Sequence, residues 1–418
     1  MRLKMTNISQ LLWLFVFFQL SITLVFLATR AEKFFTFEIY LQGVKYSTLL
    51  LLIISVFALM NKRQSIFSFD PIKYVFVLQI IILYFVMIIH TDIKAINSPT
   101  ILFMLISALA IFGNDIRLKT INLIAIMLSF LNFTIVMLQI LSIIPVAQDN
   151  VREGLNLISD RPTGLLFNAF AMGYASVITF AICLYFVNKK KLVILNLIGA
   201  LFSFTSVLLS VTRTPLILMI ISGILILLQK TKFVANNWKL VTIAIPSGLV
   251  LFPLATVFLG NLIGNQDMAT LNGRTFLWDC VTSRWQQFIP FGVGVQGAFP
   301  QGFCSDDEWF SKLRHPENMF LLNYVESGLL GFFGLVLLFV VSLWFSGKAL
   351  AKGSALPMAV SATFLMSSIF YVPLFHYLPF LENRTADRGV FNFYLFTILW
   401  MAILNSTRLE KEQQPTKK

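Results

Sequence analysis

Charged side chains are scarce in this sequence, where they make up 12% of the 418 residues. Soluble globular domains carry about 25% charged residues and about 45–50% apolar ones. This chain is 57% hydrophobic and contains 43 phenylalanines, a balance that excludes an ordinary soluble domain. The apolar blocks are also too long and continuous for the alternating strands of a membrane barrel, which run to about ten residues. The composition therefore predicts an all-α polytopic membrane protein.

Residues suited to metal binding or to a catalytic triad are also scarce. The chain has three cysteines and three histidines, and we find no metal-ligand spacing, serine–histidine–aspartate set or Asp-X-Asp pair. Cys183 lies in an apolar run and is expected to pack there. Cys280 and Cys304 share a polar interval, which leaves a disulfide open if that interval lies outside the cytoplasm. We therefore expect no metal and no cofactor, with arginines supplying the electrostatic stabilisation of any reaction.

Apolar stretches close to the length that crosses a bilayer as a helix, about 17–25 residues, recur along the whole chain. We predict about twelve transmembrane helices, the first of them retained rather than cleaved as a signal peptide. We find no internal repeat and no Pro- or Ser-rich linker, so residues 1–418 are expected to form a single integral membrane domain. The predicted spans are 10–28, 46–60, 74–90, 99–113, 120–144, 165–187, 192–210, 215–229, 239–260, 328–346, 356–373 and 389–405.

The distribution of lysine and arginine predicts how these helices are oriented. Cytoplasmic loops are enriched in both residue types, and the basic clusters here fall in alternate loops and in both termini. With the N-terminus inside, the inner basic positions are Arg2, Lys4, Lys62, Arg63, Arg117, Lys119, Lys189, Lys190, Lys191, Lys230, Lys232, Lys239, Lys348, Lys352, Arg408, Lys411, Lys417 and Lys418. The net charge of +13 is thus explained by topology, and no nucleic-acid partner is expected.

One long polar interval, residues 261–327, separates the apolar blocks and is predicted to be a loop on the outer face of the membrane. Loops on a rigid scaffold often carry function. The cations of the outer loops are mainly arginines: Arg152, Arg161, Arg213, Arg274, Arg284, Arg314, Arg384 and Arg388. Arginine suits bidentate recognition of phosphate oxygens, so the set favours an anionic ligand. The alternatives are lipid headgroups or pairing with Asp160, Asp279 or Asp387.

Three arginine motifs lie close to predicted membrane boundaries. Residues 161–168, Arg-Pro-Thr-Gly-Leu-Leu-Phe-Asn, come where an outer loop returns to the membrane, and the glycine permits a tight turn. Arg213 lies in residues 210–215, a turn so short between two apolar runs that an arginine there requires a partner. Arg274 precedes Trp278 by four residues, which places both on one helical face. This tryptophan could lie at the membrane interface or stack on a sugar ring.

His315 and Glu317 lie just before an apolar helical run, with Pro316 suited to an early helix position. The dipole at a helix start disfavours imidazolium, which favours His315 as a proton acceptor. The same dipole weakens Glu317 as a base. A helix cap paired with Arg314 is the structural alternative. The residues alone leave open which of the two accepts a proton.

Taken in order, these motifs resemble the O-antigen ligase/polymerase family of bacterial inner-membrane glycosyltransferases. The Gly-X-Gly run among them lacks the strand–turn–helix context and the Lys-Ser/Thr of a nucleotide loop, so we exclude a nucleotide site. The resemblance extends over residues 161–331 and rests on Arg161-X-X-Gly164 with the downstream Asn168, Thr212-Arg213, Gly273-Arg274-X-X-X-Trp278, Gly292-Val293-Gly294, and Asn318 followed by Gly328 and Gly331.

The resemblance implies a GT-C-like helical fold and a reaction on the periplasmic face of the inner membrane, without a metal or a nucleotide sugar. It implies a donor glycan carried on undecaprenyl pyrophosphate, held by Arg213 and Arg274, with Arg161 as a weaker third contact. Ligases of the family carry His-Asn where this chain has Glu317-Asn318. Polymerases vary more at this position, so the Glu-Asn pair favours a polymerase.

We therefore expect a repeat-unit polymerase, in which a sugar hydroxyl of one lipid-linked oligosaccharide attacks the anomeric carbon of another. Glu317 or His315 would accept the proton, and Trp278, Trp309 and Asn318 would contact sugar. The expected partners are the lipid-linked oligosaccharide, membrane lipid and a chain-length regulator protein. The alternatives are an O-antigen ligase that transfers glycan to lipid A–core, and a transporter or flippase. A transporter should carry ionisable groups near mid-membrane, whereas here they crowd one face.

Overall fold

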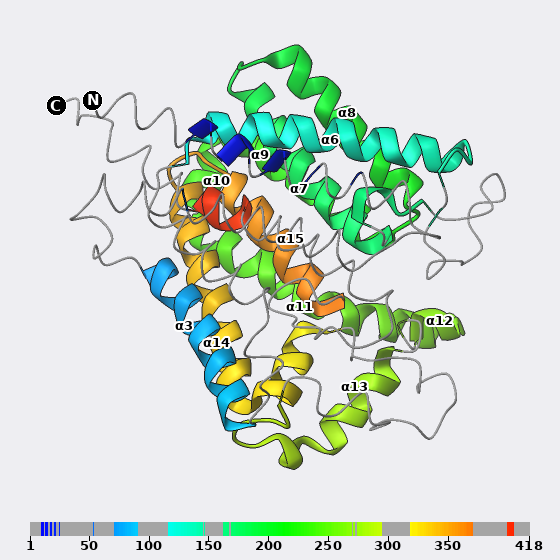
Figure 1. Cartoon of the computed structure of the whole chain (residues 1–418), viewed down its shortest axis with the longest axis vertical. Helices are drawn as coiled ribbons and strands as arrows, with labels where there is room; N and C mark the ends of the chain where they lie inside the picture. The colour runs from blue at the N-terminus through cyan, green and yellow to red at the C-terminus, as the bar shows by residue number, and fades with distance from the viewer. Residues whose placement is uncertain are drawn as a thin grey trace.

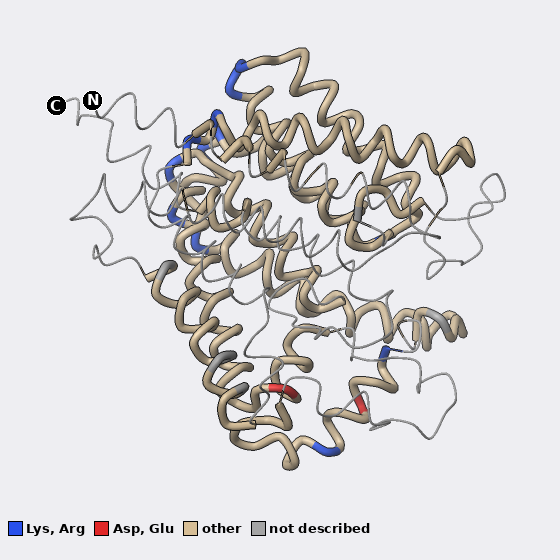
Figure 2. The backbone as a smooth tube through the Cα atoms, in the orientation of Figure 1, with Lys and Arg blue, Asp and Glu red and all other residues tan. Residues whose placement is uncertain are grey.

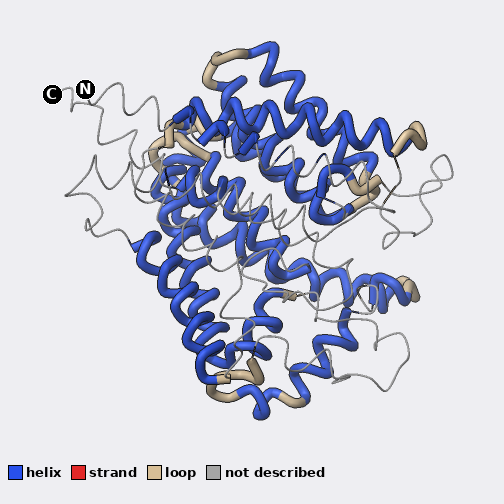
Figure 3. Tube along the Cα trace, viewed as in Figure 1, coloured by secondary structure: helices blue, strands red, loops and turns tan. Residues whose placement is uncertain are grey.

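A computed structural model of the chain describes residues 71–90, 116–144, 162–166, 169–269, 274–294, 318–370 and 399–404, with some single positions elsewhere. Every element within these ranges is a helix, and no strand occurs among them (Figure 3). The all-helical class predicted from composition is thus confirmed for the described residues.

The described helices follow one another along the chain, with no strand between them in the described residues (Figure 1). They are α3 (Pro71–Ile89), α6 (Leu118–Ile140), η2 (Gly164–Leu166), α7 (Ala169–Asn188), α8 (Val193–Leu209), α9 (Arg213–Leu228), α10 (Lys232–Asn236), α11 (Trp238–Leu262), α12 (Gln266–Ala269), α13 (Arg274–Ser283), η3 (Trp285–Phe288), α14 (Met319–Leu350) and α15 (Leu356–Phe370).

Four of the described helices, α6, α7, α11 and α14, are long and apolar enough to cross a membrane. The helices α8, α9 and α15 are apolar but shorter. Each of these seven overlaps a span predicted from sequence, and so does α3. The predicted spans at 10–28, 46–60, 99–113 and 389–405 lie largely outside the described residues. The count of about twelve spans and the GT-C-like fold therefore stay predictions.

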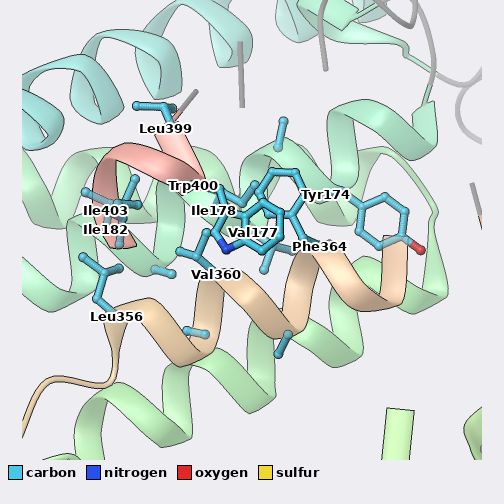
Figure 4. Packing of buried hydrophobic residues seen from close by; sticks show 14 of the residues in the cluster. Tyr174, Val177, Ile178, Ile182, Leu356, Val360, Phe364, Leu399, Trp400 and Ile403 are labelled. Carbon is cyan, nitrogen blue, oxygen red and sulfur yellow. The ribbon is translucent and has the colours of Figure 1, made fainter. Parts of the chain in front are cut away.

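Helix α7 lies at the centre of the packing, in contact with α6, α8, α9 and α15, and most of its residues are buried. Its alanine, glycine and serine residues let neighbouring helices approach closely, as is usual for helices in a membrane. On its apolar side, Val177 and Ile178 pack near Phe364 and Trp400 (Figure 4). The centroids of the Phe364 and Trp400 rings are 4.7 Å apart in a stacked arrangement.

Buried hydroxyl groups join α7 to the two helices beside it. The Ser203 hydroxyl of α8 lies 2.9 Å from that of Ser129 in α6 and 2.8 Å from that of Thr179 in α7. These hydrogen bonds satisfy polar groups that would be costly to leave unpaired in an apolar interior. They therefore fix how α6, α7 and α8 are aligned.

The turns predicted to lie in the cytoplasm meet at one end of the molecule, where most of the described Lys and Arg positions gather (Figure 2). Lys230 Nζ donates a hydrogen bond to the carbonyl oxygen of Asn188 at 3.2 Å, and the Ala355 N–H donates to Gln229 Oε1 at 3.0 Å. These bonds connect the turns that follow α7, α9 and α14. Helices α12 and α13 and the first part of α14 lie at the opposite end (Figure 1).

The polar interval at 261–327 contains helical segments of its own: α12, α13 and η3. Helix α14 begins at residue 319, before the predicted span at 328–346. It consists of two helical parts that join at Gly328, which interrupts the helix with φ 62° and ψ −152°, and the predicted span corresponds to the second part. Cys280 within the interval is disulfide-bonded, while Cys304 lies outside the described residues. Cys183 is a buried free thiol, as predicted.

Candidate functional site

The turn between α8 and α9 places Arg213 at the first position of α9. Val211 has a φ of 53°, a left-handed conformation that is unfavourable for a β-branched residue. This residue reverses the chain, so α9 begins two residues later. The tight turn predicted at residues 210–215 is thus present, and the Arg213 side chain is exposed at its end.

Gly173 of α7 determines how closely the start of α9 packs. A Cβ atom at residue 173 would lie 2.7 Å from Pro215 Cγ and 2.7 Å from Thr212 Oγ1, so no side chain fits without displacing α9. The next residue, Tyr174, is fully buried and neighbours the Thr214 side chain. The start of α9 is therefore seated directly on this part of α7.

Arg274 is the first residue of α13 and is only 9% exposed. Its Nη1 donates a hydrogen bond to the Leu271 carbonyl oxygen at 3.2 Å, and its Cζ lies 5.5 Å from the centroid of the Phe170 ring in α7. The guanidinium also interacts electrostatically with the Tyr174 phenol. Arg274 is thus a positive charge held in place by an aromatic face and a backbone carbonyl.

Arg213 and Arg274 therefore converge on one segment of α7 although they are distant in the chain. Arg274 lies against Phe170 and Tyr174, which are one turn apart, and Tyr174 also neighbours the residue that follows Arg213. Each arginine begins a helix, where backbone N–H groups lack intrahelical partners and the dipole is positive. Helix starts and guanidinium groups are both features that can bind an anion.

Two amide side chains of α6 fix the turn at residues 162–166. Gln139 Oε1 accepts hydrogen bonds from the backbone N–H groups of Thr163 at 3.0 Å and Gly164 at 2.9 Å. Asn132 Oδ1 accepts one from the next N–H at 3.1 Å. Gly164 has a φ of 58°, so the tight turn predicted there is present. Arg161 lies outside the described residues, and its contact with pyrophosphate stays a prediction.

The Gly-Val-Gly run pairs with the interruption in α14. Three backbone hydrogen bonds join residues 290–294 to α14: Val293 N–H to Val325 O at 2.9 Å, Gly294 N–H to Glu326 O at 3.2 Å, and Leu329 N–H to Pro290 O at 3.1 Å. They satisfy groups that the interruption removes from the helical ladder. A Cβ at Gly328 would lie 2.0 Å from the Pro290 oxygen, and one at Gly292 would lie 2.5 Å from the Val325 oxygen. The glycines thus allow this docking.

Asn318 caps the start of α14. Its Oδ1 accepts hydrogen bonds from the N–H groups of Phe320 at 3.0 Å and Leu321 at 3.1 Å, as is typical of an N-cap residue. The helix begins at Met319, so Pro316 precedes it in the sequence and the early helix position predicted for this proline was wrong. Glu317 and His315 lie outside the described residues, so their roles stay predictions, as does the sugar contact of Asn318.

Trp278 lies one turn after Arg274 on α13 and is partly buried. Its ring centroid is 6.4 Å from that of Phe370 at the end of α15, so packing accounts for part of its surface. The sugar contact predicted for Trp278 is untested by this arrangement. Trp309, the other predicted sugar platform, lies outside the described residues.

Several residues that fix the turn at 162–166 or pack beside Arg274 and the start of α9 were not predicted from sequence: Asn132, Gln139, Phe170, Gly173 and Tyr174. They lie inside apolar spans, where packing is the usual role, although polar groups within spans are a signal of function. Glu326, in the polar interval, was not predicted as a site residue either. It is a carboxylate only 6% exposed beside the interruption in α14.

The comparison with known protein families identifies the part of the chain that carries most of these features. Residues 198–336 match the family model described as O-antigen ligase. The matched segment contains both arginines of the site, Trp278, Asn318 and the Gly-Val-Gly run, whereas the turn at 162–166 precedes it. No curated protein matches the chain. The family match agrees with the resemblance identified from the motifs: residues 198–336 of this chain are similar to the O-antigen ligase family.

Proposed function

We propose that the chain is a glycosyltransferase that polymerises the repeat units of an O-antigen or other surface polysaccharide. Its donor would be an oligosaccharide linked to undecaprenyl pyrophosphate. The family match supports a ligase- or polymerase-type enzyme. The observation that carries the proposal is the convergence of Arg213 and Arg274, each at a helix start, on the first turns of α7. Such a site suits the diphosphate of a lipid carrier.

In the proposed reaction, a sugar hydroxyl of one lipid-linked oligosaccharide attacks the anomeric carbon of another. A glycosidic C–O bond forms, the bond from the anomeric carbon to the phosphate oxygen breaks, and undecaprenyl pyrophosphate leaves with the electron pair. Arg213 and Arg274, with Arg161 as a third contact, stabilise the charge that develops on the leaving group, so no metal is required. The proton of the attacking hydroxyl passes to Glu317 or His315.

The cap at the start of α14 supports a proton acceptor in this part of the chain. Asn318 holds the helix start through two hydrogen bonds, and Glu317 is its neighbour in sequence. A base next to a rigid helix start would be well positioned, because only a few dihedral angles separate it from a fixed backbone. Trp278 and Trp309 are the proposed sugar platforms.

The distribution of charge supports a site on the outer face of the bacterial inner membrane. The basic turns lie at the end of the molecule opposite α13 and the first part of α14 (Figures 1 and 2). Since basic loops stay in the cytoplasm, the end with α13 would face the periplasm. Lipid-linked repeat units and a chain-length regulator protein are the proposed partners there.

An O-antigen ligase, which transfers finished glycan to lipid A–core, is the second candidate, because the matched family model carries that description. Glu317 in place of the histidine of ligases favours the polymerase. A transporter is less well supported. The buried charges among the described residues, Arg274 and Glu326, belong to α13 and the first part of α14, which lie at one end of the molecule (Figure 1).

A reconstitution assay separates these functions. Purified protein in proteoliposomes receives one lipid-linked repeat unit, with or without lipid A–core, and the products are resolved by length. We expect a ladder of lipid-linked polymers and release of undecaprenyl pyrophosphate without lipid A–core, both unaffected by EDTA. Glycan transfer that occurs only with lipid A–core would identify a ligase. Movement of the lipid-linked unit across the bilayer without bond formation would identify a transporter.

A further inference from the structure

Tyr174 is a polar residue in α7, a helix whose residues are mostly buried. Its side chain has no exposed surface, and Figure 4 shows its ring beside Val177 and Phe364 with the hydroxyl oxygen turned away from that apolar cluster. Phenylalanine would fill the same apolar space. The packing of α7 therefore does not explain why this position carries a hydroxyl.

The hydroxyl of Tyr174 makes no hydrogen bond of standard geometry. Its hydrogen-bonding contact with the Thr214 side chain falls short of that geometry, and the Arg274 guanidinium is close enough to interact with it electrostatically. An unsatisfied buried donor opposes stability, and most buried polar groups in native proteins have a partner. These two neighbours place the hydroxyl near the first turn of α9 and the start of α13. A ligand at that place would supply the missing acceptor.

We propose that the Tyr174 hydroxyl is a further donor to the diphosphate of the lipid carrier, beside Arg213 and Arg274. This inference rests on the proposed function, because it requires a diphosphate at this site. The phenol O–H would donate to a phosphate oxygen that the two guanidinium groups hold from the helix starts. A neutral donor adds a hydrogen bond without adding charge, and a bond to an ionised oxygen is stronger than a neutral one.

The test compares Tyr174→Phe with wild type in nanodiscs, using undecaprenyl pyrophosphate as the probe and undecaprenyl phosphate as the comparison. Loss of one hydrogen bond to a charged group should weaken pyrophosphate binding by roughly tenfold to a hundredfold. Without ligand, the thermal unfolding midpoint should stay equal or rise, because an unsatisfied hydroxyl is removed. The matched control is Tyr185→Phe on the same helix, whose hydroxyl lies 3.4 Å from Ser354 Oγ. It should leave pyrophosphate affinity unchanged.

The outcomes distinguish a role of the Tyr174 hydroxyl in ligand binding from a purely structural role. Weaker pyrophosphate binding by the Tyr174→Phe protein with an undiminished midpoint supports the proposal, since a structural hydroxyl would show the reverse. Unchanged affinity in this variant, at any midpoint, overturns the role of Tyr174 while leaving the proposed function intact. If wild type binds undecaprenyl pyrophosphate no better than undecaprenyl phosphate, the proposed diphosphate site fails, and the role of Tyr174 fails with it.

Discussion

Arginine at the first position of a helix opposes the positive end of the helix dipole, which costs about 0.3–1 kcal/mol at an exposed site. Both Arg213 and Arg274 occupy such positions. A bound anion reverses the sign of this effect, because it interacts favourably with the guanidinium and with the free N–H groups of the first turn. Arginine at these positions is therefore consistent with the proposed binding of a diphosphate.

Lysine in place of either arginine tests whether the guanidinium fork matters beyond its charge. Arg213→Lys and Arg274→Lys should each reduce the polymerisation rate by on the order of 100–1000-fold, because a point charge cannot hold two phosphate oxygens at once. The rate is measured in membranes with matched protein levels. Arg284→Lys, at an exposed arginine beyond α13, is the control and should remain active. Full activity of both test variants would eliminate bidentate phosphate binding at this site.

The proton acceptor can be assigned with two substitutions before α14. We expect Glu317→Gln to abolish most polymer formation, because the amide keeps the shape of the side chain but cannot accept the proton. His315→Ala should have the smaller effect. Glu308→Gln, the same chemical change elsewhere in the polar interval, is the control. Normal polymer length from the Glu317→Gln protein would transfer the role to His315, and a silent His315→Ala as well would remove general-base catalysis from this motif.

At the scale of elements, the interruption in α14 depends on glycine. Gly328 has a φ of 62°, and the Gly-Val-Gly run supplies the hydrogen bonds that the helix loses there. The first part of α14, which starts at the Asn318 cap, is thereby tied to the segment that follows α13. Two motifs that lie apart in the sequence thus pack against each other.

Substitution of Gly328 should loosen this support. Gly328→Ala places a Cβ 2.0 Å from the Pro290 oxygen at a positive φ, and backbone strain alone costs about 1–3 kcal/mol. We expect a lower thermal unfolding midpoint in detergent together with reduced activity. Gly248→Ala in α11, where a Cβ meets nothing within 4 Å, should keep or raise the midpoint, since alanine favours a helix by about 1 kcal/mol. Equal midpoints for the two variants would show that the interruption tolerates side chains.

The long apolar helices among the described residues each overlap a span predicted from sequence, because hydrophobic length alone defines a membrane span. Sequence reasoning also found the turn before Arg213, but it placed the start of the helix that follows His315 too early, at Pro316 instead of Met319. It could not find Gln139 and Asn132 as the residues that hold the turn at 162–166, since their partners lie on another element. Gly173 could not be predicted either, because its importance comes from the close approach of α9. Contacts between helices that are distant in the chain leave no pattern in the local amino-acid sequence.

At the scale of the whole molecule, two independent features support the proposal that the polar interval lies outside the cytoplasm. The basic turns gather at the end opposite α13 (Figure 2), as expected if they stay in the cytoplasm. Cys280 of α13 is disulfide-bonded, and disulfides persist in oxidising compartments such as the periplasm. Charge and redox chemistry therefore agree on the same orientation.

This orientation can be measured with a reporter enzyme that is active only outside the cytoplasm. Fusions at residue 270 or 306 should be active, because both positions lie in the polar interval around α13, whereas fusions after Lys190 or Lys418 should be inactive. The physical reason is the cost of moving clustered lysines across the bilayer against the insertion bias. A complementary reporter that works only in the cytoplasm should give the reverse pattern at all four positions. If the fusions at 270 and 306 were active only in the cytoplasm, Arg274 and the helix start at Asn318 would face the wrong compartment, and a periplasmic polymerase would no longer be tenable.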